Sequence, residues 1–246
     1  MSFVVDTMSE RFYTEILLQP GGAVTLDEAE ARHLMQVLRH KPGDEVVVFD
    51  GRGAEADARI ESASKRGATL QVLAVRTTEP DGPPRLTIAT AVPKGDRFRW
   101  LVEKATELGV DRLIPLSTER SVVDPRDTKL DRMRQAVVAA CKQCRRNRLM
   151  EISPTATLTQ FLAEPSAVSA LAVAHPKGRP ASEWLGAVPS TIPLAVLVGP
   201  EGGLTDEEVE RAITAGAERI ALGAHILRIE TAVIAIAALA MIGSRS

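Results

Sequence analysis

The chain has 246 residues, of which 45% are hydrophobic, 25% charged and 3% aromatic, and its formal net charge is −2 at pH 7. This composition is ordinary for a globular protein and argues against disordered, collagen-like and disulfide-scaffold classes. A chain of this length buries roughly three quarters of its unfolded surface, so it can form one large domain or two smaller ones.

Cysteine usage and hydropathy indicate the compartment. Cys141 and Cys144 are too few for a secreted disulfide framework, and the first ten residues lack the basic and apolar regions of a signal peptide. The longest apolar run, residues 232–242, has 11 residues, whereas a membrane-spanning helix needs about 20. We therefore expect a cytoplasmic protein without a membrane segment. The same run has no polar side, so we expect it to be buried all round, in the core or in a dimer interface.

The first third of the chain alternates short β-like runs with glycine-containing turns. The runs lie at residues 45–49, 56–60 and 69–75. Several short strands at this spacing predict a small β-barrel. One helix is predicted at about residues 27–38, with Leu34, Val37 and Leu38 on its apolar face.

A cluster of prolines and glycine at residues 79–84 predicts a domain boundary, because neither a helix nor a central strand crosses such a sequence. After it, strand-length apolar runs alternate with helical patterns. The strands are predicted at 86–92, 113–116, 168–174, 194–198 and 219–222, and the helices at 97–108, 130–140, 205–216 and 232–242. Continuous apolar strands are typical of a parallel sheet covered on both faces. We expect a barrel domain over residues 1–78 and an α/β domain over residues 84–246.

Three short glycine-containing loops follow predicted strands, at residues 175–178, 199–203 and 222–228. Open α/β sheets bind ligands at the carboxyl ends of their strands, so we expect these loops to converge on one pocket. The loop 199–203 contains three glycines, which let the backbone approach a ligand closely, and one carboxylate, Glu201. Taken alone, it also fits a tight turn into the next helix, for which Thr205 and Glu208 predict a capping box.

Several common catalytic and metal motifs are absent from the sequence. It has no G-x-x-x-x-G-K-[ST], no G-x-G-x-x-G opening a helix and no G-x-S-x-G, so nucleotide hydrolysis and triad hydrolysis get little support. The single pair Cys141 and Cys144 cannot fill a tetrahedral zinc site, and the four histidines show no ligand spacing. We expect no metal.

Positive charge gathers in one stretch of this nearly neutral chain. Residues 126–148 contain eight Lys or Arg against two Asp. Such a stretch indicates either an anionic partner or a solvated helix face.

The loops at 199–203 and 222–232 resemble the signature of the RsmE family, which are SPOUT-class methyltransferases that modify N3 of a uridine in 16S ribosomal RNA. Further segments match in order and extend the resemblance over nearly the whole chain. Residues 94–96, 104–109 and 120–123 match the middle region of the family, and residues 11–13, 33–39 and 50–53 match its N-terminal PUA-like RNA-binding barrel.

The resemblance implies a SPOUT-type knotted parallel sheet, with a C-terminal trefoil knot that holds S-adenosylmethionine, and a PUA-like β-barrel before it. It also implies a homodimer whose partner is 16S rRNA in the small ribosomal subunit. The expected cofactor-binding residues are Ala174, His175, Val198, Gly199, Glu201, Gly202, Leu222, Gly223, Ile226 and Leu227.

The reaction that the resemblance implies suggests roles for three residues. Arg228 and Arg146 are candidates for stabilising the charge that develops on the uracil carbonyls, and Glu201 for orienting the cofactor or accepting the N3 proton. Contacts to RNA are expected from Arg11, Arg32, Arg39, Lys94, Lys142, Arg145 and Arg146. The family usually has an acid where this chain has Lys142 and a glycine where it has Arg145, so this segment is where the fit to RNA would differ.

Two other functions stay open at this point. One is a SPOUT methyltransferase that acts on another RNA atom, such as a ribose 2′-hydroxyl. The other is a protein that binds ribosomal RNA without chemistry, and the intact glycine loops argue against it.

Overall fold

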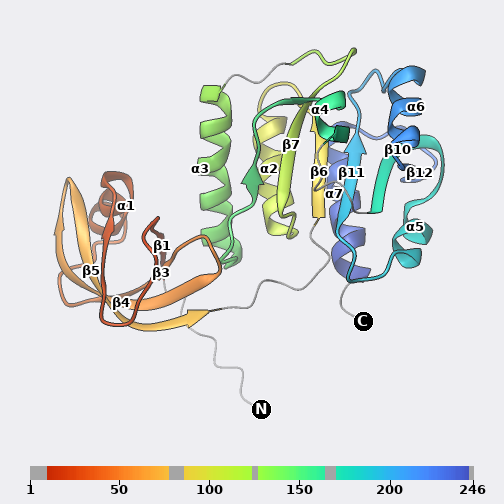
Figure 1. Ribbon diagram of the computed structural model, residues 1–246. Helices are drawn as coiled ribbons and strands as arrows, with labels where there is room; N and C mark the ends of the chain where they lie inside the picture. Colours follow the sequence, from red (N-terminus) through yellow and green to blue (C-terminus); the bar gives the residue numbers. More distant parts are fainter. Residues whose placement is uncertain (1–9, 78–85, 124–126, 164–169, 244–246) are drawn as a thin grey trace. The chain divides into compact units, whose positions relative to one another are not determined.

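The structure is a computed structural model that describes residues 10–77, 86–123, 127–163 and 170–243 (Figure 1). The chain forms two compact units. The first contains the described residues up to 77 together with Cys141–Leu149, and the second contains residues 86–140 and 150–243. Helix α3, Asp127–Cys144, therefore contributes its last turn to the first unit.

The first unit is built on a five-stranded sheet with the order β1-β3-β4-β5-β2. Its strands are β1 Arg11–Tyr13, β2 Ala23–Leu26, β3 Glu45–Phe49, β4 Ala54–Ser64 and β5 Gly67–Thr77. Only β1 and β3 pair in parallel, and the other pairs are antiparallel. The two edge strands contribute Phe12 and Val24 to the same apolar core, so the sheet curls around that core.

The helix predicted at residues 27–38 is instead two short elements. Helix α1, Glu28–Arg32, begins where the side chain of Asp27 accepts the N–H of Glu30, and it passes into a π-helical turn, η1, His33–Val37. A π turn is wider than an α turn and changes the direction of the side chains that follow it. Leu34 is buried as predicted, but Val37 is exposed, so its predicted place on the apolar face is wrong.

The second unit is built on a parallel seven-stranded sheet, as predicted from its continuous apolar runs. The order is β12-β10-β11-β6-β7-β8, with β9 also paired to β7, and every pair is parallel. The strands are β6 Leu86–Ala91, β7 Arg112–Ser117, β8 Glu151–Ile152, β9 Ala156–Thr157, β10 Ala170–Pro180, β11 Leu194–Val198 and β12 Glu218–Ala221.

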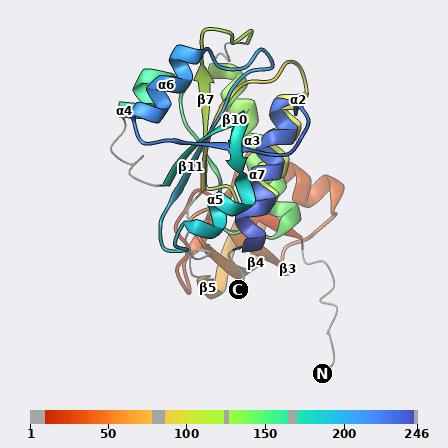
Figure 2. The same cartoon turned by 90° about the vertical axis from the view of Figure 1, so that its right-hand side faces the viewer.

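Helices cover both faces of this sheet (Figure 2). The helices besides α3 are α2 Arg97–Glu107, α4 Leu158–Ala163, α5 Ala181–Ala187, α6 Asp206–Thr214 and α7 Ile229–Gly243. Helices α4 and α6 share an apolar core with one face, where Phe161 and Ala212 meet Leu197 of the central strand β11. Helices α2 and α7 pack against each other on the opposite face.

The apolar helix α7 is not buried all round in the single chain. Val233, Ile236 and Ala237 are buried, whereas Leu239 is 38% exposed. Among the described residues, no helix combines the length and the apolar character that crossing a bilayer requires.

The pairing of strand β10 with β12 is interrupted by an irregularity. Ala174 and Arg179 both pair with Ile220 of β12, so residues 175–178 bulge out between them. The loop predicted after residue 174 is therefore a bulge inside a longer strand, while residues 168 and 169 of the predicted strand lie outside the described residues. Gly178 sits within this bulge, and a Cβ added there would lie 2.5 Å from the backbone N and C atoms of Ile220.

We expect Gly178→Ala to lower the free energy of unfolding by about 2 kcal/mol, because the clash is with backbone and can be relieved only by separating two strands. Chemical denaturation measures this change. The matched control is Gly186→Ala in α5, where the added Cβ meets nothing within 4 Å and stability should stay unchanged or rise. A Gly178→Ala protein as stable as the wild type would contradict this close approach.

Candidate active site

A cavity of about 350 Å³ lies beside the bulge of β10 and the carboxyl ends of β11 and β12. Its walls come from residues 174–176, 198–204, 220, 222–223 and 225–227, with Ile229 and Ala232 of α7 completing the lining. The three loops predicted to converge therefore meet in one pocket. Its size lies within the range of pockets that hold small ligands.

All ten residues expected to bind a cofactor line this pocket. They are Ala174, His175, Val198, Gly199, Glu201, Gly202, Leu222, Gly223, Ile226 and Leu227. The lining also includes residues that were not predicted, among them Pro176, Ile220 and His225. Pro176 and His225 lie within the predicted loops. The sequence therefore located the loops of the pocket better than it located the single residues that line it.

Backbone geometry explains the glycines of the loop after β11. A Cβ on Gly199 would lie 2.8 Å from Cγ of Leu204, and Gly203 has a φ of +71°, which favours glycine. Both positions therefore favour glycine, and Glu201 is the only charged residue of the loop.

Two polar contacts join this loop to the segment after β7. Arg120 Nη1 donates to the Gly202 carbonyl at 2.8 Å. The buried Glu208 carboxylate accepts the N–H of Thr205 at 2.9 Å and the N–H of Glu119 at 3.0 Å. The predicted capping box of α6 is thus present, and its carboxylate also holds a neighbouring strand end, which the sequence spacing did not reveal.

Arg97, at the start of α2, lies between two carboxylates of the site. Its Nη2 is 3.5 Å from Oε1 of Glu201, and its Nη1 is 3.5 Å from Oε1 of Glu230 in the first turn of α7. Glu230 is buried, whereas Glu201 stays accessible at the pocket. Arg97 was missed in the sequence, although it directly follows the matched segment 94–96.

Two exposed side chains stand beside the pocket on the segment before α7. Ile226 lines the cavity while keeping most of its surface exposed, and Arg228 is exposed directly before the lining residue Ile229. Both can therefore meet a substrate that approaches the cavity.

His175 is held in its neutral form at the pocket wall. Burial lowers its pKa below the ordinary value of 6.5, and the positive charges of Arg219 and Lys177 lower it further. Its Nδ1 accepts the N–H of Lys177 at 3.1 Å, which needs an unprotonated Nδ1.

Because the pKa of His175 is lower in the folded protein than in the unfolded chain, protonation of this residue favours unfolding. The stability that the neutral form contributes is fully present above pH 6.5 and is lost as the pH falls through the lower pKa of the folded protein. We therefore expect the wild type to lose more stability than His175→Gln on acidification from about pH 7 to about pH 5. Parallel denaturation curves for both proteins across this range would contradict the burial of a neutral histidine.

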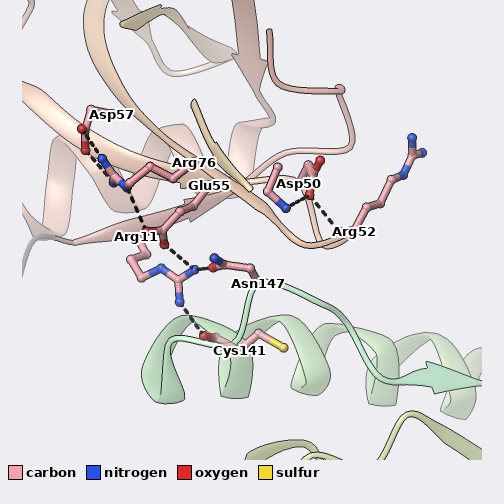
Figure 3. A network of polar contacts seen from close by, with 9 residues as sticks. Arg11, Asp50, Arg52, Glu55, Asp57, Arg76, Cys141 and Asn147 are labelled. Atoms are coloured by element: carbon pink, nitrogen blue, oxygen red, sulfur yellow. Dashed lines mark hydrogen bonds and ion pairs between the residues drawn. The ribbon is translucent and has the colours of Figure 1, made fainter. Parts of the chain in front are cut away.

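Arg11 occupies a different place from the one expected for a phosphate contact. Its side chain is only 5% exposed. Its guanidinium donates to the Cys141 carbonyl at 3.1 Å, to Asn147 Oδ1, and to Glu55 Oε2 at 3.5 Å (Figure 3). The guanidinium carbon also lies 4.6 Å from the centre of the Phe49 ring. These contacts are internal to the first unit and argue against a direct contact of Arg11 with RNA.

The other six expected RNA contacts differ in how available they are. Arg32, Arg39, Lys94 and Arg145 are exposed, and Arg146 is half-buried. Arg32 also pairs with Glu28 along α1 at 2.6 Å. Lys142 is engaged, because its Nζ lies 2.8 Å from both carboxylate oxygens of Glu30. Of the three proposed catalytic residues, Glu201 lines the pocket and Arg228 stands beside it, while Arg146 belongs to the first unit.

Comparisons with known proteins agree with this division of the chain. Residues 80–241 match the profile of an RNA methyltransferase domain, and residues 26–73 match that of an RNA methyltransferase PUA domain. The chain is 36% identical over 218 residues to ribosomal RNA small subunit methyltransferase E of Synechocystis sp., covering 85% of this chain and 69% of that protein. It is 30% identical over 236 residues to the Bacillus subtilis protein of the same name, covering 91% and 92%.

Solved structures show the same fold. A ribosomal RNA small subunit methyltransferase E from Neisseria gonorrhoeae, bound to S-adenosyl methionine, matches with a TM-score of 0.83 and 32% identity over 94% of this chain and 95% of that chain. A Legionella pneumophila protein solved in complex with the same cofactor matches with a TM-score of 0.86 and 29% identity, over 96% and 98% of the two chains.

Proposed function

Because the chain belongs to the RNA methyltransferase family, we propose that it transfers a methyl group from S-adenosylmethionine to N3 of a uridine in 16S ribosomal RNA. One observation carries the proposal: the ten residues expected to hold the cofactor all line a single pocket, formed by the bulge of β10 and the loops after β11 and β12. Relatives of this chain named as methyltransferases of small-subunit ribosomal RNA support the substrate.

The pocket residues fit S-adenosylmethionine. The glycine loop offers backbone donors and acceptors at close range, Leu222 and Leu227 offer apolar surface for a purine ring, and Glu201 offers a carboxylate to a cationic group. When bound, the cofactor supplies a methyl group on a positively charged sulfur. His175 lines the same pocket, and its lowered pKa favours the uncharged imidazole beside a cationic ligand.

The proposed chemistry requires three steps from the protein and its substrate. The uridine would leave its stack, and its N3 would give its proton to solvent water. The N3 lone pair would then bond to the methyl carbon while the carbon–sulfur bond breaks, and that electron pair would stay on the sulfur of the leaving S-adenosylhomocysteine. Negative charge spreads to the uracil carbonyl oxygens as the proton leaves. Arg228 beside the pocket is placed to stabilise that charge, and Arg146 of the first unit stays a second candidate. We assign Glu201 to orientation of the cofactor.

In this proposal, exposed cationic side chains bind the RNA. Arg32, Arg39, Lys94 and Arg145 would contact phosphates, with Arg146 beside Arg145. Affinity for RNA should then fall steeply with salt, because bound phosphates release their counterions. The proposal includes no metal, and a cytoplasmic location for the protein is part of it.

A homodimer is part of the same proposal. Leu239 on α7 is 38% exposed and Trp100 on α2 is 46% exposed, on two helices that pack against each other. Apolar surface of this kind typically marks an interface, and a second copy of the chain is the proposed occupant. The trefoil knot that the family resemblance implies stays a prediction.

Methyl transfer to small ribosomal subunits that lack the modification tests the proposed function. With labelled S-adenosylmethionine, we expect one labelled uridine in 16S rRNA, and reverse transcription should stop there because a methyl group on N3 blocks base pairing. Labelled RNA without a stop would point to another atom, such as a ribose 2′-hydroxyl. Cofactor binding without transfer would overturn the assigned substrate.

Glu201→Gln tests the assignment of the pocket carboxylate. Removing one charged partner of a cationic ligand costs about 1.5 kcal/mol, so we expect binding of S-adenosylmethionine to weaken about tenfold by calorimetry. The control is Glu207→Gln, which removes the same charge from an exposed position in α6 outside the pocket. Equal affinities for the wild type and Glu201→Gln would remove Glu201 from the cofactor site.

A further inference from the structure

The segment Cys141–Leu149 is anchored to the first unit at both of its ends. Arg11 donates to the Cys141 carbonyl at the end of α3 and to the side chain of Asn147 (Figure 3). The Asn147 carbonyl accepts the N–H of Gly53 at 3.0 Å, and the N–H of Leu149 donates to the Gly51 carbonyl at 2.9 Å. Residues 143–146 are therefore a short span held between two fixed points.

A second contact, the ion pair between Lys142 and Glu30, fixes the direction of the Lys142 side chain at the start of this span. Lys142 Nζ lies 2.8 Å from both oxygens of Glu30, and the two side chains are 20% and 16% exposed. The same Nζ lies 5.3 Å from the centre of the Phe12 ring, and Glu30 Oε2 is 3.4 Å from the N–H of Tyr13. The ion pair thus lies over β1, where partial burial leaves its two charges less screened by salt than those of an exposed pair.

In this arrangement, the side chain of Lys142 points in a different direction from those of its neighbours in the chain. Successive side chains of a helix point about 100° apart, so a Lys142 turned toward Glu30 directs Gln143 elsewhere. Gln143 and Arg145 are exposed, and Arg145 has a φ of +63° directly after the end of α3. That backbone conformation is one that favours glycine. Arg145 therefore carries a long cationic side chain on a sharp turn.

We propose that Lys142 is a positioning residue: its ion pair with Glu30 orients Gln143 and Arg145 toward RNA, and Lys142 itself does not contact phosphate. The inference rests on the proposed function, because it names how one part of the chain would meet its RNA.

Exchanging the two charges tests this role. The variants are Lys142→Glu, Glu30→Lys and the double variant with both changes, and the measured quantity is the affinity for small-subunit ribosomal RNA. A positioning pair predicts that each single variant loses affinity about fivefold or more, since like charges then face each other, and that the double variant returns to within about twofold of wild type. A phosphate contact predicts instead that the double variant binds as poorly as Lys142→Glu.

A double-mutant cycle with the oriented residues gives an independent readout. Because Lys142 acts through Gln143 and Arg145, Lys142→Gln lowers affinity in the wild type but changes it less than about twofold when Gln143→Ala and Arg145→Gln are already present. An equal loss in both backgrounds would show that Lys142 itself contacts RNA and would overturn the proposal. Lys142→Gln also serves if charge reversal prevents folding, and Lys65→Gln, on an exposed turn of the first unit, is the matched control for loss of one charge.

Two further measurements separate this inference from the proposed function. Binding of S-adenosylmethionine should be the same in all variants, because the pocket residues belong to the second unit. Absence of ribosomal RNA binding in the wild type would contradict the proposed function and the inference with it. Wild-type binding and methylation together with an unrestored double variant would contradict the inference alone.

Discussion

Parallel pairing of β10 with β11 and β12 is the constraint on which the rest of the site depends. Because all three strands run in the same direction, their carboxyl ends lie at one edge of the sheet. Three loops that are far apart in the sequence then close around one cavity. The bulge at residues 175–178 brings a segment of β10 against the backbone of Ile220, and a glycine at position 178 is what allows that approach.

Around these strand ends, polar contacts keep the loops in place. Glu208 caps its own helix and also holds Glu119, Arg120 binds the carbonyl of Gly202, and Arg97 lies between Glu201 and Glu230. Arg97 and Arg120 lie next to or within segments that match the family, yet neither lines the cavity. Their contacts give those segments a physical role: they hold the loop that would carry the cofactor. A preformed site of this kind reduces the cost of ordering on binding.

Much of the fold could be predicted from local patterns, because those patterns are set by local physics. The apolar runs at 45–49 and 194–198 are β3 and β11 with the same bounds, and the spacing of Thr205 and Glu208 is a capping box. The pocket loops could be found because glycines follow buried strands. The contacts that depend on distant residues could not be found in this way.

The misplaced residues illustrate that limit. Val37 is exposed because a π turn interrupts a helical spacing that the sequence alone leaves unbroken. From the sequence alone, Arg11 is expected to be a surface cation. In the structure, its guanidinium donates to Cys141 and Asn147, which are more than 100 residues away in the chain. Lys142 is likewise engaged by Glu30, which no spacing in the sequence connects to it. The short elements β8, β9, α4 and α5 have too few residues to show a period.

We infer that the bulge of β10 and the loops after β11 and β12 form the cofactor site before any RNA is present. A crystal structure of the protein grown with S-adenosylmethionine and without RNA is the direct test. We expect cofactor density bordered by residues 174–176, 198–204, 222–223 and 225–227, with these segments close to their positions in the present structure. Cofactor density at any other place, or a cofactor that enters only after these loops have separated, would contradict it.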